Sequence, residues 1–273
     1  MQLSRSWAFF GHFLCVTLCL GVLLPMLMVV GTSLKPPGEV YSANPFPLDP
    51  TLQNYVEVLG GSEYLRFFAN SVVNAVARVG GQLVICLLAA YAFARFEFFG
   101  REPLFYLVLG AMMIPPQLTM IPNYMLMANL DWFDTFAGLI VPNLAAPLGV
   151  FLLRQHMLAF PRELLDAAEI DGAGQWGALW RIVVPNLRPA LAALAIILSI
   201  ECWNEYFWPL LVTETSATQT IQIGLRRFLQ EEMGDRFGPL MAAVTLSSLP
   251  ALIVFMLFQR HVLTSFLSSG LKG

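Results

Sequence analysis

Six stretches of mostly apolar residues run through the chain, and each is long enough to cross a membrane. A helix needs roughly 20 such residues to span the hydrocarbon core of a bilayer. Because that core holds no water to bond an exposed backbone, only helices and closed barrels cross it. We therefore predict an all-α, polytopic membrane protein with six transmembrane helices. The stretches are Trp7–Val30, Phe67–Phe93, Pro103–Ile121, Phe136–Met157, Pro189–Val212 and Pro239–Val262.

The composition agrees with a chain immersed in lipid. Hydrophobic residues make up 57% of the 273 residues, and charged residues only 12%. The net charge of −3 gives no basic character that would attract nucleic acid. All four cysteines lie within apolar segments, without the spacing of a zinc site, so we predict neither metal ligands nor disulfides. The first apolar stretch is too long for a signal peptide, and we expect it to act as an anchor.

The distribution of lysine and arginine orients the six predicted helices. Cytoplasmic loops carry an excess of these residues. With the N-terminus inside, the inner segments hold nine of them and the outer segments five, with Arg78 inside a span. Both termini, and the loop between the fourth and fifth stretches, are therefore expected in the cytoplasm. The inner nine are Arg5, Arg95, Arg101, Arg154, Arg162, Arg181, Arg188, Arg260 and Lys272.

Two of the predicted outer segments are long. Residues 31–66 are rich in Pro, Gly and Asn, and we expect an ordered loop with short turns there. Residues 213–238 contain "IQIGLRRFLQEEM", which we expect to form a short helix. Within the third apolar stretch, Pro115 and Pro116 interrupt the hydrogen-bond ladder of a helix, so a kink or an unwound turn is expected at that point.

The predicted cytoplasmic loop after the fourth stretch is acidic in a chain that has few charges. If Pro161 is its first helical residue, a helix here has an acidic side and a side of leucine and alanine. Gly172 accepts the left-handed conformation that ends a helix, so we expect the helix to stop there. A second amphipathic run, "QWGALWRIVV", then leads to Pro185. The four acids are Glu163, Asp166, Glu169 and Asp171.

Lipid and protein are the two partners that this acidic helix can have. A helix that lies on the inner leaflet usually carries Lys and Arg on its polar face. Anionic lipid repels an acidic face instead. Small residues around Gly172 let the surface of another protein approach the backbone closely. The sequence therefore favours a protein partner.

The same loop resembles the E-A-A-x-x-x-G-x9-I-x-L-P signature of permease subunits from bacterial ATP-binding-cassette (ABC) importers. The spacing is complete, with Asp166 in place of Glu and Val184 in place of Leu. The segments "AYAFARFEF", "MIPPQLTMIPNY", "WNEYFWPLLV" and "SGLKG" resemble carbohydrate-type permeases of the maltose and glycerol-phosphate importer group. The resemblance thus covers nearly the whole chain. The residues that match the signature are Asp166, Ala167, Ala168, Gly172, Ile182, Val184 and Pro185.

The resemblance implies a type I ABC importer permease fold in the bacterial inner (plasma) membrane. In that family the loop forms a coupling helix, which docks on a separate ATPase subunit and transmits its closure to the membrane helices. In the maltose group the C-terminal tail reaches between two ATPase subunits, and Gly270, Leu271, Lys272 and Gly273 resemble it. The coupling residues implied here are Glu163, Asp166, Ala167, Ala168, Asp171, Gly172, Ala173 and Pro185.

The implied partners are a second permease subunit, two ABC ATPase subunits and an extracytoplasmic solute-binding protein. The implied division of the chain has three parts. Residues 1–66 form the first transmembrane helix and an extracytoplasmic loop. Residues 67–262 form the permease core, with the coupling loop at about 158–188, and residues 263–273 form a cytoplasmic tail.

The chain itself carries no phosphate-binding loop. Its two lysines, Lys35 and Lys272, lack the G-x-x-x-x-G-K-[ST] context. We therefore expect no enzymatic activity and no cofactor on this chain, with ATP and Mg bound by the partner ATPase. The function implied is import of a sugar or sugar derivative, with glycerol phosphate or another anionic, sugar-like substrate as the alternative. The competing class, a secondary transporter or channel independent of ATP, leaves the spacing of the coupling loop unexplained.

Polar residues also recur inside the predicted membrane spans. In the second stretch they follow every four residues, so they form one stripe. A charge at membrane depth is costly, so Arg78 is expected to face the bundle interior or a water-filled path. In the fifth stretch three polar residues lie among aromatic ones. The stripe consists of Asn70, Asn74, Arg78 and Gln82, and the second set of Glu201, Asn204 and Glu205.

Two interpretations of these polar residues remain open. In the first, carboxylates bond the hydroxyls of a sugar in a transport path, and aromatic faces contact its C–H surfaces. In the second, the residues are structural: Arg78 pairs with Glu201 or Glu205, or the acids lie near an aromatic belt at the membrane surface. The candidate path residues are Asn70, Asn74, Arg78, Glu201, Asn204, Glu205 and Trp208.

Overall fold

The computed structural model describes residues 5–42, 44–159, 163, 165, 170, 172–231 and 237–270. Every regular element in those residues is a helix. The chain forms two compact units. Unit 1 comprises Met1–Arg66 and Gly224–Leu249, and unit 2 comprises Phe67–Ile223 and Pro250–Gly273.

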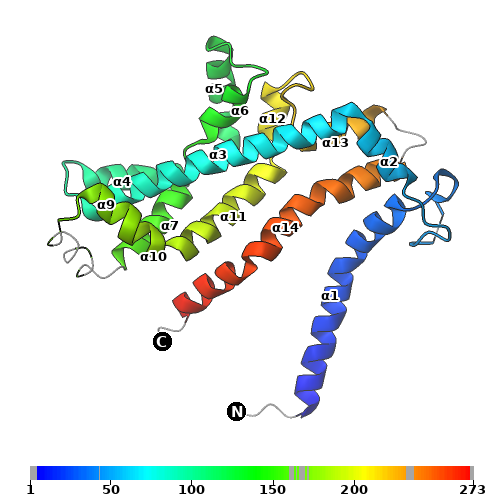
Figure 1. Ribbon diagram of the computed structural model, residues 1–273, viewed down its shortest axis with the longest axis horizontal. Coiled ribbons are helices and arrows are strands. Elements are labelled where there is room, and N and C mark those ends of the chain that lie inside the picture. Colours follow the sequence, from blue (N-terminus) through cyan, green and yellow to red (C-terminus); the bar gives the residue numbers. More distant parts are fainter. Residues whose placement is uncertain are drawn as a thin grey trace. The chain divides into compact units, whose positions relative to one another are not determined.

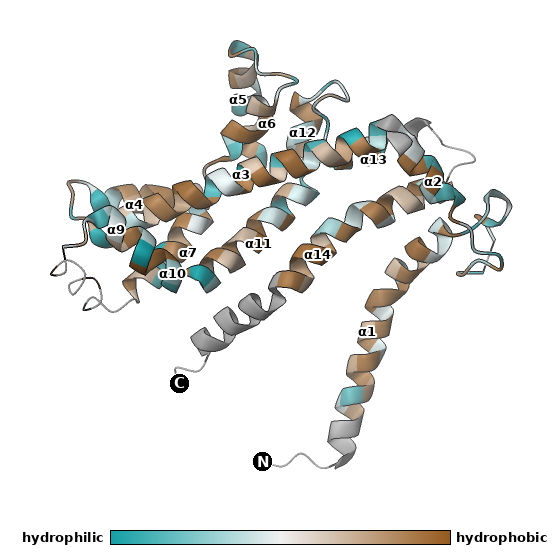
Figure 2. Cartoon of the chain, in the orientation of Figure 1, coloured by the Kyte–Doolittle hydropathy of each residue, from teal (hydrophilic) through white to brown (hydrophobic). Residues whose placement is uncertain are grey.

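Three of the described helices are long and apolar enough to cross a membrane by themselves. They are α1 (Arg5–Ser33), α3 (Ser62–Arg95) and α14 (Phe237–Gly270). Three further pairs of helices meet the same test when each bent pair is counted as one span, which gives up to six spans. The prediction of an all-α chain with six membrane-crossing stretches is confirmed. Hydrophobic residues dominate α1, α3 and α11 in Figure 2.

The first bent pair consists of α4 (Arg101–Ala111) and α5 (Pro116–Asn129), which meet at 99°. Pro115 is extended, with ψ at 131°, because the ring of Pro116 disfavours a helical conformation in the residue before it. Pro116 then begins the new helix, where its missing N–H costs nothing. The kink predicted at these two prolines is confirmed.

The other two bent pairs are less sharply angled. In the second, α6 (Phe136–Ile140) and the short turn η2 (Val141–Asn143) meet α7 (Pro147–Leu158) at 45°. In the third, the segment Gln175–Asn186 meets α11 (Arg188–Asn204) at 76°. That segment consists of α9 (Gln175–Ala178), the π-helical turn η3 (Leu179–Val183) and α10 (Val184–Asn186).

The fifth predicted span, Pro189–Val212, is wrong as a single helix. The helix α11 ends at Asn204, Glu205 is extended with ψ at 125°, and α12 (Phe207–Val212) follows as a separate turn. Pro209 explains the break. A proline in a helix has no N–H to donate, and its ring clashes with the carbonyl four residues earlier, which here belongs to Glu205.

Helices also form in the two long segments that were predicted outside the membrane. Residues 213–238 contain α13 (Ile221–Glu231), so the short helix expected there is confirmed. Residues 31–66 contain the turn η1 (Pro37–Glu39) and the helix α2 (Gln53–Gly60), which the prediction of loop and turns missed. The hydrophobic positions of α2 are too few in eight residues to stand out from a loop rich in Pro and Gly.

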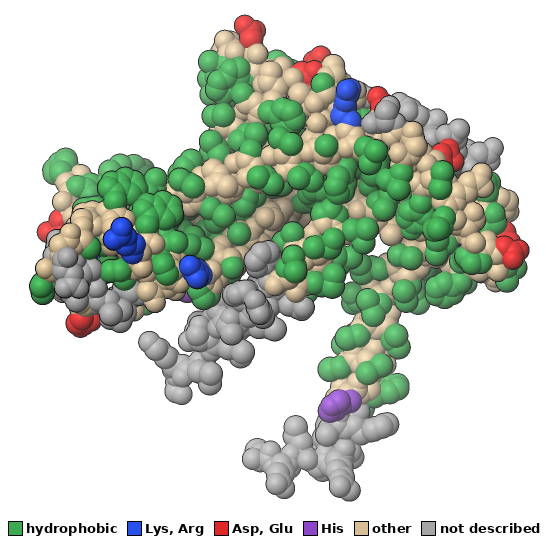
Figure 3. Space-filling view, viewed as in Figure 1, with side chains coloured by type: hydrophobic (Ala, Val, Ile, Leu, Met, Phe, Trp, Pro, Cys, Tyr) green, Lys and Arg blue, Asp and Glu red, His purple; other side chains and the backbone are tan. Residues whose placement is uncertain are grey.

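Unit 1 is held together at the end of α1. The last carbonyls of a helix lack partners within it. The buried Asn54 of α2 supplies a donor to the last of them, because its Nδ2 donates to the carbonyl of Ser33 at 2.8 Å. The same Nδ2 donates to the carbonyl of Lys35, two residues after the helix, at 2.9 Å. Gly238 packs directly on this amide, since a Cβ there would lie 2.8 Å from Nδ2 of Asn54. Most of α1 is apolar on all sides and exposed, and Figure 3 shows hydrophobic side chains along it.

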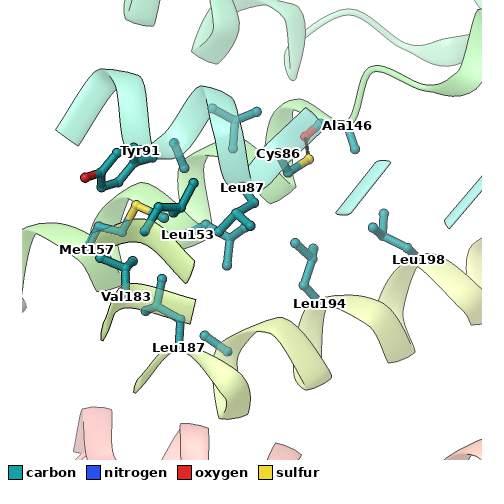
Figure 4. Close-up of a cluster of buried hydrophobic side chains, with 14 of the residues drawn as sticks. Cys86, Leu87, Tyr91, Ala146, Leu153, Met157, Val183, Leu187, Leu194 and Leu198 are labelled. Atoms are coloured by element: carbon teal, nitrogen blue, oxygen red, sulfur yellow. Dashed lines mark hydrogen bonds between the residues drawn. The ribbon is translucent and has the colours of Figure 1, made fainter. Parts of the chain in front are cut away.

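Unit 2 has one main hydrophobic core, in which α3, α7 and α11 meet. In Figure 1, α4, α7, α9 and α10 gather near the C-terminal end of α3. Figure 4 shows Cys86, Leu153 and Leu194, one from each of the three meeting helices, among the side chains that point into the core. Gly149 allows this approach, because a Cβ there would lie 2.7 Å from Sγ of Cys86 and 3.1 Å from Leu194. Close packing of this kind gives the unit a rigid centre.

Candidate functional site

The acidic loop is the first candidate site, and part of it is described. Glu163 is helical and exposed, Ala173 and Pro185 are half-buried, and Gly172 is exposed. Gly172 has φ at +81°, the left-handed conformation predicted for it. Among the residues that the structure describes, no atom lies within 4 Å of the position that a Cβ would take there. The left-handed backbone conformation therefore favours glycine at this position.

Other residues of the predicted coupling set lie outside the described residues. These are Asp166, Ala167, Ala168 and Asp171 in the loop, and Leu271, Lys272 and Gly273 in the tail. Gly270 is the last residue of α14.

The segment after Gly172 is anchored in the core of unit 2. The hydroxyl of Tyr91 on α3 donates to Oε1 of Gln175 at 3.0 Å. Leu179, Val183 and Leu187 are buried in the same cluster as Leu153 of α7. A displacement of the loop would therefore act on α3, α7 and α11 through packed side chains rather than through a flexible linker.

The polar stripe of α3 is the second candidate site, and it faces the interior of unit 2. Asn70 donates to the carbonyl of Gln219 at 2.9 Å, and Gln82 to that of Asn143 at 2.7 Å. Asn74 lies 3.5 Å from Sγ of Cys202. The stripe thus ties α3 to the residues before α7, to α11 and to the loop before α13.

Arg78 of this stripe forms an ion pair with Glu205. The side chains are 11% and 22% exposed, so the arginine faces inward as predicted. Of the two carboxylates proposed as its partner, Glu205 is the one that pairs. Glu205 is available because its backbone has left the helix at the break before α12. The pair therefore joins the middle of α3 to the point where α11 ends.

The remaining candidate path residues divide into a buried one and two exposed ones. Trp208 is buried, and its Nε1 donates to the carbonyl of Gly138 at 3.0 Å. Glu201 and Asn204 are exposed on α11. The structure therefore places Asn70, Asn74, Arg78, Glu205 and Trp208 in contacts within unit 2, and leaves Glu201 and Asn204 on its surface.

Asp134 forms a connection that the sequence did not reveal. It lies before α6 with φ at +54°. One carboxylate oxygen accepts the amides of Glu214 at 3.0 Å and Thr215 at 3.1 Å, and also the hydroxyl of Thr218. The other accepts the hydroxyl of Thr215 at 2.6 Å. The partners are about 80 residues away in the sequence, and no local sequence pattern predicts the pairing.

These hydrogen bonds determine the charge state of Asp134. Partial burial disfavours the charged form and raises the pKa, but the bonds from Thr215, Thr218 and the two amides outweigh it. Together they lower the pKa from 3.8 to about 2. The carboxylate is therefore charged at any physiological pH.

Comparison with known proteins identifies the chain's family. Residues 82–266 match the family described as the binding-protein-dependent transport system inner membrane component. The chain belongs to this family. It is accordingly a multi-pass permease subunit of the inner membrane and not an enzyme. The resemblance drawn from the loop spacing is confirmed at the level of the family.

Individual relatives extend the match over most of the permease. It is 33% identical to the arabinooligosaccharides transport system permease protein AraQ of Bacillus subtilis, with 92% of this chain and 91% of the relative covered. It is 36% identical to the sn-glycerol-3-phosphate transport system permease protein UgpE of Brucella suis, with 78% and 79% covered.

A solved structure shows the same fold. A chain of a bacterial ABC transporter involved in the import of the acidic polysaccharide alginate superposes with a TM-score of 0.85. The match covers 95% of this permease and 99% of that chain, at 23% sequence identity. The six-span permease fold expected from the sequence is thereby confirmed.

Proposed function

We propose that this permease is one half of an ATP-driven importer that moves a sugar or sugar derivative across the inner membrane. The observation that carries the proposal is the acidic loop, whose spacing to Gly172 and Pro185 is that of an ABC coupling helix. The arabinooligosaccharides relative, and the diacetylchitobiose uptake permease of Streptomyces coelicolor at 30% identity, support a carbohydrate substrate.

The loop transmits movement from an ATPase subunit to the membrane helices. Its docking residues are Glu163, Asp166, Ala167, Ala168, Asp171, Gly172, Ala173 and Pro185. The small residues let the ATPase surface approach the backbone, and the carboxylates supply charge-assisted contacts. The packing of Leu179, Val183 and Leu187 against α7 supports this route, because a rigid core carries a displacement onward.

The proposed assembly combines this permease with three other kinds of component: a second permease, two ATPase subunits and a solute-binding protein. A second permease subunit completes the path, and two ABC ATPases bind ATP and Mg, since this chain has no phosphate-binding loop. An extracytoplasmic solute-binding protein delivers the substrate. In this proposal the tail Gly270–Gly273 reaches the ATPases and both termini are cytoplasmic. The proposed functional division into residues 1–66, 67–262 and 263–273 differs from the two compact units, because it assigns residues 224–249 to the permease core.

The loop's role is tested in a transporter reconstituted with its ATPase subunits. Asp166→Lys reverses a docking charge, and Gly172→Val adds bulk at the docking surface and strains a residue at φ +81°. Both variants are expected to abolish ATP-dependent uptake and to release the ATPase subunits during purification. Gly174→Val is the matched control, because Gly174 has φ at −67° and no atom of a described residue within 4 Å of a Cβ.

Two results would contradict the proposal. The first is full uptake and retained ATPase subunits in both loop variants. The second is uptake by the permease in proteoliposomes without any ATPase, which would instead indicate a secondary transporter or channel.

A further inference from the structure

One face of α11 is polar and exposed in the middle of an apolar helix. Ile197, Ile200, Glu201 and Asn204 are all exposed, and their spacing of three and four residues puts them on one side of the helix. Leu194, Leu198 and Cys202 are buried on the other side. We call the first set the Glu201 face.

Glu201 lies deep within the span. It follows Arg188, the first residue of α11, by thirteen positions, so it lies roughly 20 Å along the helix at 1.5 Å per residue. The hydrocarbon core is about 30 Å thick. A carboxylate at that depth does not face lipid, because its desolvation is too costly, but faces another subunit or a water-filled path.

No described residue of this permease satisfies Glu201. It makes no ion pair and no hydrogen bond with any other part of the chain that the structure describes. Arg78 is the one cation between Arg66 and Arg95 on α3, and it is already paired with Glu205. The carboxylate of Glu201 is thus left to bind something outside the chain.

The charges around the Glu201 face select against an anion. Arg78 is neutralised by Glu205, and Glu201 adds a further negative charge, so this part of the permease is net acidic. A phosphate or a uronate is usually bound by a free cation, and Arg78, the cation of this part of α3, is already paired. A sugar hydroxyl, in contrast, donates a hydrogen bond to a carboxylate.

Two buried acceptors on α3, in the interior of unit 2, also lack a donor among the described residues. Asn74 and Gln82 are only 2% and 4% exposed, yet Oδ1 of Asn74 and Oε1 of Gln82 have no donor among the described residues. Asn74 contacts Cys202, which lies on the buried side of α11, opposite the Glu201 face. Unsatisfied acceptors of this kind bind water or hydroxyl donors, so the interior behind α11 adds no group that would attract an anion.

We propose that Glu201 and Asn204 form a binding site for the hydroxyls of an uncharged saccharide in the translocation path. The site rests on the proposed import function and narrows its substrate class. The carboxylate of Glu201 accepts hydrogen bonds from sugar hydroxyls, and the amide of Asn204 both donates and accepts them. Phe207, exposed directly after the helix break, offers an aromatic face to the C–H surface of the ring. Glycerol phosphate and acidic polysaccharides fall outside this class.

The test uses the complete transporter, with its second permease, ATPases and binding protein, in proteoliposomes. Arabinotriose and N,N′-diacetylchitobiose are the neutral probes, and sn-glycerol-3-phosphate is the anionic probe. We expect ATP-dependent uptake of a neutral probe and none of the anion. Glu201→Gln should lower that uptake about tenfold, because a charge-assisted hydrogen bond is lost. The exposed Glu97 gives the matched control, Glu97→Gln, which should transport normally.

Each other outcome overturns a specific part of the proposal. Uptake by Glu201→Gln at the wild-type rate would remove the binding site. Loss of the second permease from purified Glu201→Gln would show that Glu201 pairs with that subunit instead. Uptake of glycerol-3-phosphate and of neither neutral probe would refute the uncharged class. Uptake without ATPase subunits would refute the import function itself, independently of Glu201.

Discussion

The contacts of Asp134 give a prediction that distinguishes the stabilising effect of its charge from the effect of its left-handed backbone conformation. Asp134→Asn removes the charge but keeps a residue that tolerates the left-handed region. Asp134→Gly removes the hydrogen-bonding side chain, but glycine adopts the left-handed backbone conformation without strain. Asp134→Ala removes the same group, and alanine is strained in that conformation. All three variants act on the amides of Glu214 and Thr215, which donate to the carboxylate at 3.0 and 3.1 Å.

The magnitude follows from the pKa and from the backbone angle. A folded-state pKa of about 2 against the ordinary 3.8 corresponds to an upper limit of about 2 kcal/mol. Because the carboxylate is partly exposed, solvent screening reduces this to about 1 kcal/mol, which is the loss expected for Asp134→Asn. Alanine at φ +54° adds about 1–2 kcal/mol of strain.

Hydrogen–deuterium exchange of residues 213–220 measures this local opening. We expect exchange to accelerate about fivefold in Asp134→Asn and on the order of 50-fold in Asp134→Ala, with Asp134→Gly between them. The amides of α4 are the internal reference. Unchanged protection in Asp134→Ala would refute the hydrogen-bonding argument, and equal effects of Asn and Ala would refute the backbone argument.

The pH dependence of the same measurement has a definite sign. The folded-state pKa of Asp134 is lowered, so its contribution to stability is complete above about pH 4 and is lost as the pH falls through about 2. The difference in protection between the wild type and Asp134→Asn should therefore be constant from pH 5 to 8. A difference that changes across that range would show that another group titrates.

Three further variants test the packing of the two units. Arg78→Met should lower stability in detergent by about 3 kcal/mol, because it leaves the Glu205 carboxylate unpaired, and the double variant with Glu205→Gln should recover part of that loss in thermal unfolding. Gly149→Ala should cost about 1–3 kcal/mol by overpacking and lower the melting temperature, whereas Gly110→Ala, with open space at its Cβ, should not. Asn54→Ala should cost about 1–3 kcal/mol and expose residues 34–52 to limited proteolysis, since two carbonyls lose their donor. Wild-type melting or digestion in any of these variants would contradict the corresponding contact.

The features that the sequence predicted correctly are local ones. Six apolar stretches are readable because the thickness of the bilayer sets their length. The kink at Pro115 and Pro116 and the left-handed Gly172 follow from the backbone chemistry of single residues. The inward orientation of Arg78 follows from the cost of a charge in hydrocarbon, whatever its partner.

The break in the fifth span shows where local reasoning was incomplete. Hydropathy treats Pro189–Val212 as one stretch, because the average over a window does not register one proline. Pro209 nevertheless prevents the carbonyl of Glu205 from continuing the helix. Pro209 is as informative about the backbone as Pro115 and Pro116 are. The break could therefore have been predicted from the sequence.

The sequence by itself determined the architecture of this permease, because lipid imposes the same demand on every span: apolar side chains and an internally bonded backbone. Only the tertiary structure decided which polar groups meet. The sequence placed Glu201 and Glu205 one turn apart and gave no reason to choose between them. The end of α11 turns Glu205 toward Arg78 and leaves Glu201 exposed. Asp134 meets Thr215 and Thr218 in the same way, across about 80 residues. Such pairs depend on three-dimensional proximity, which residue type and spacing along the chain do not encode.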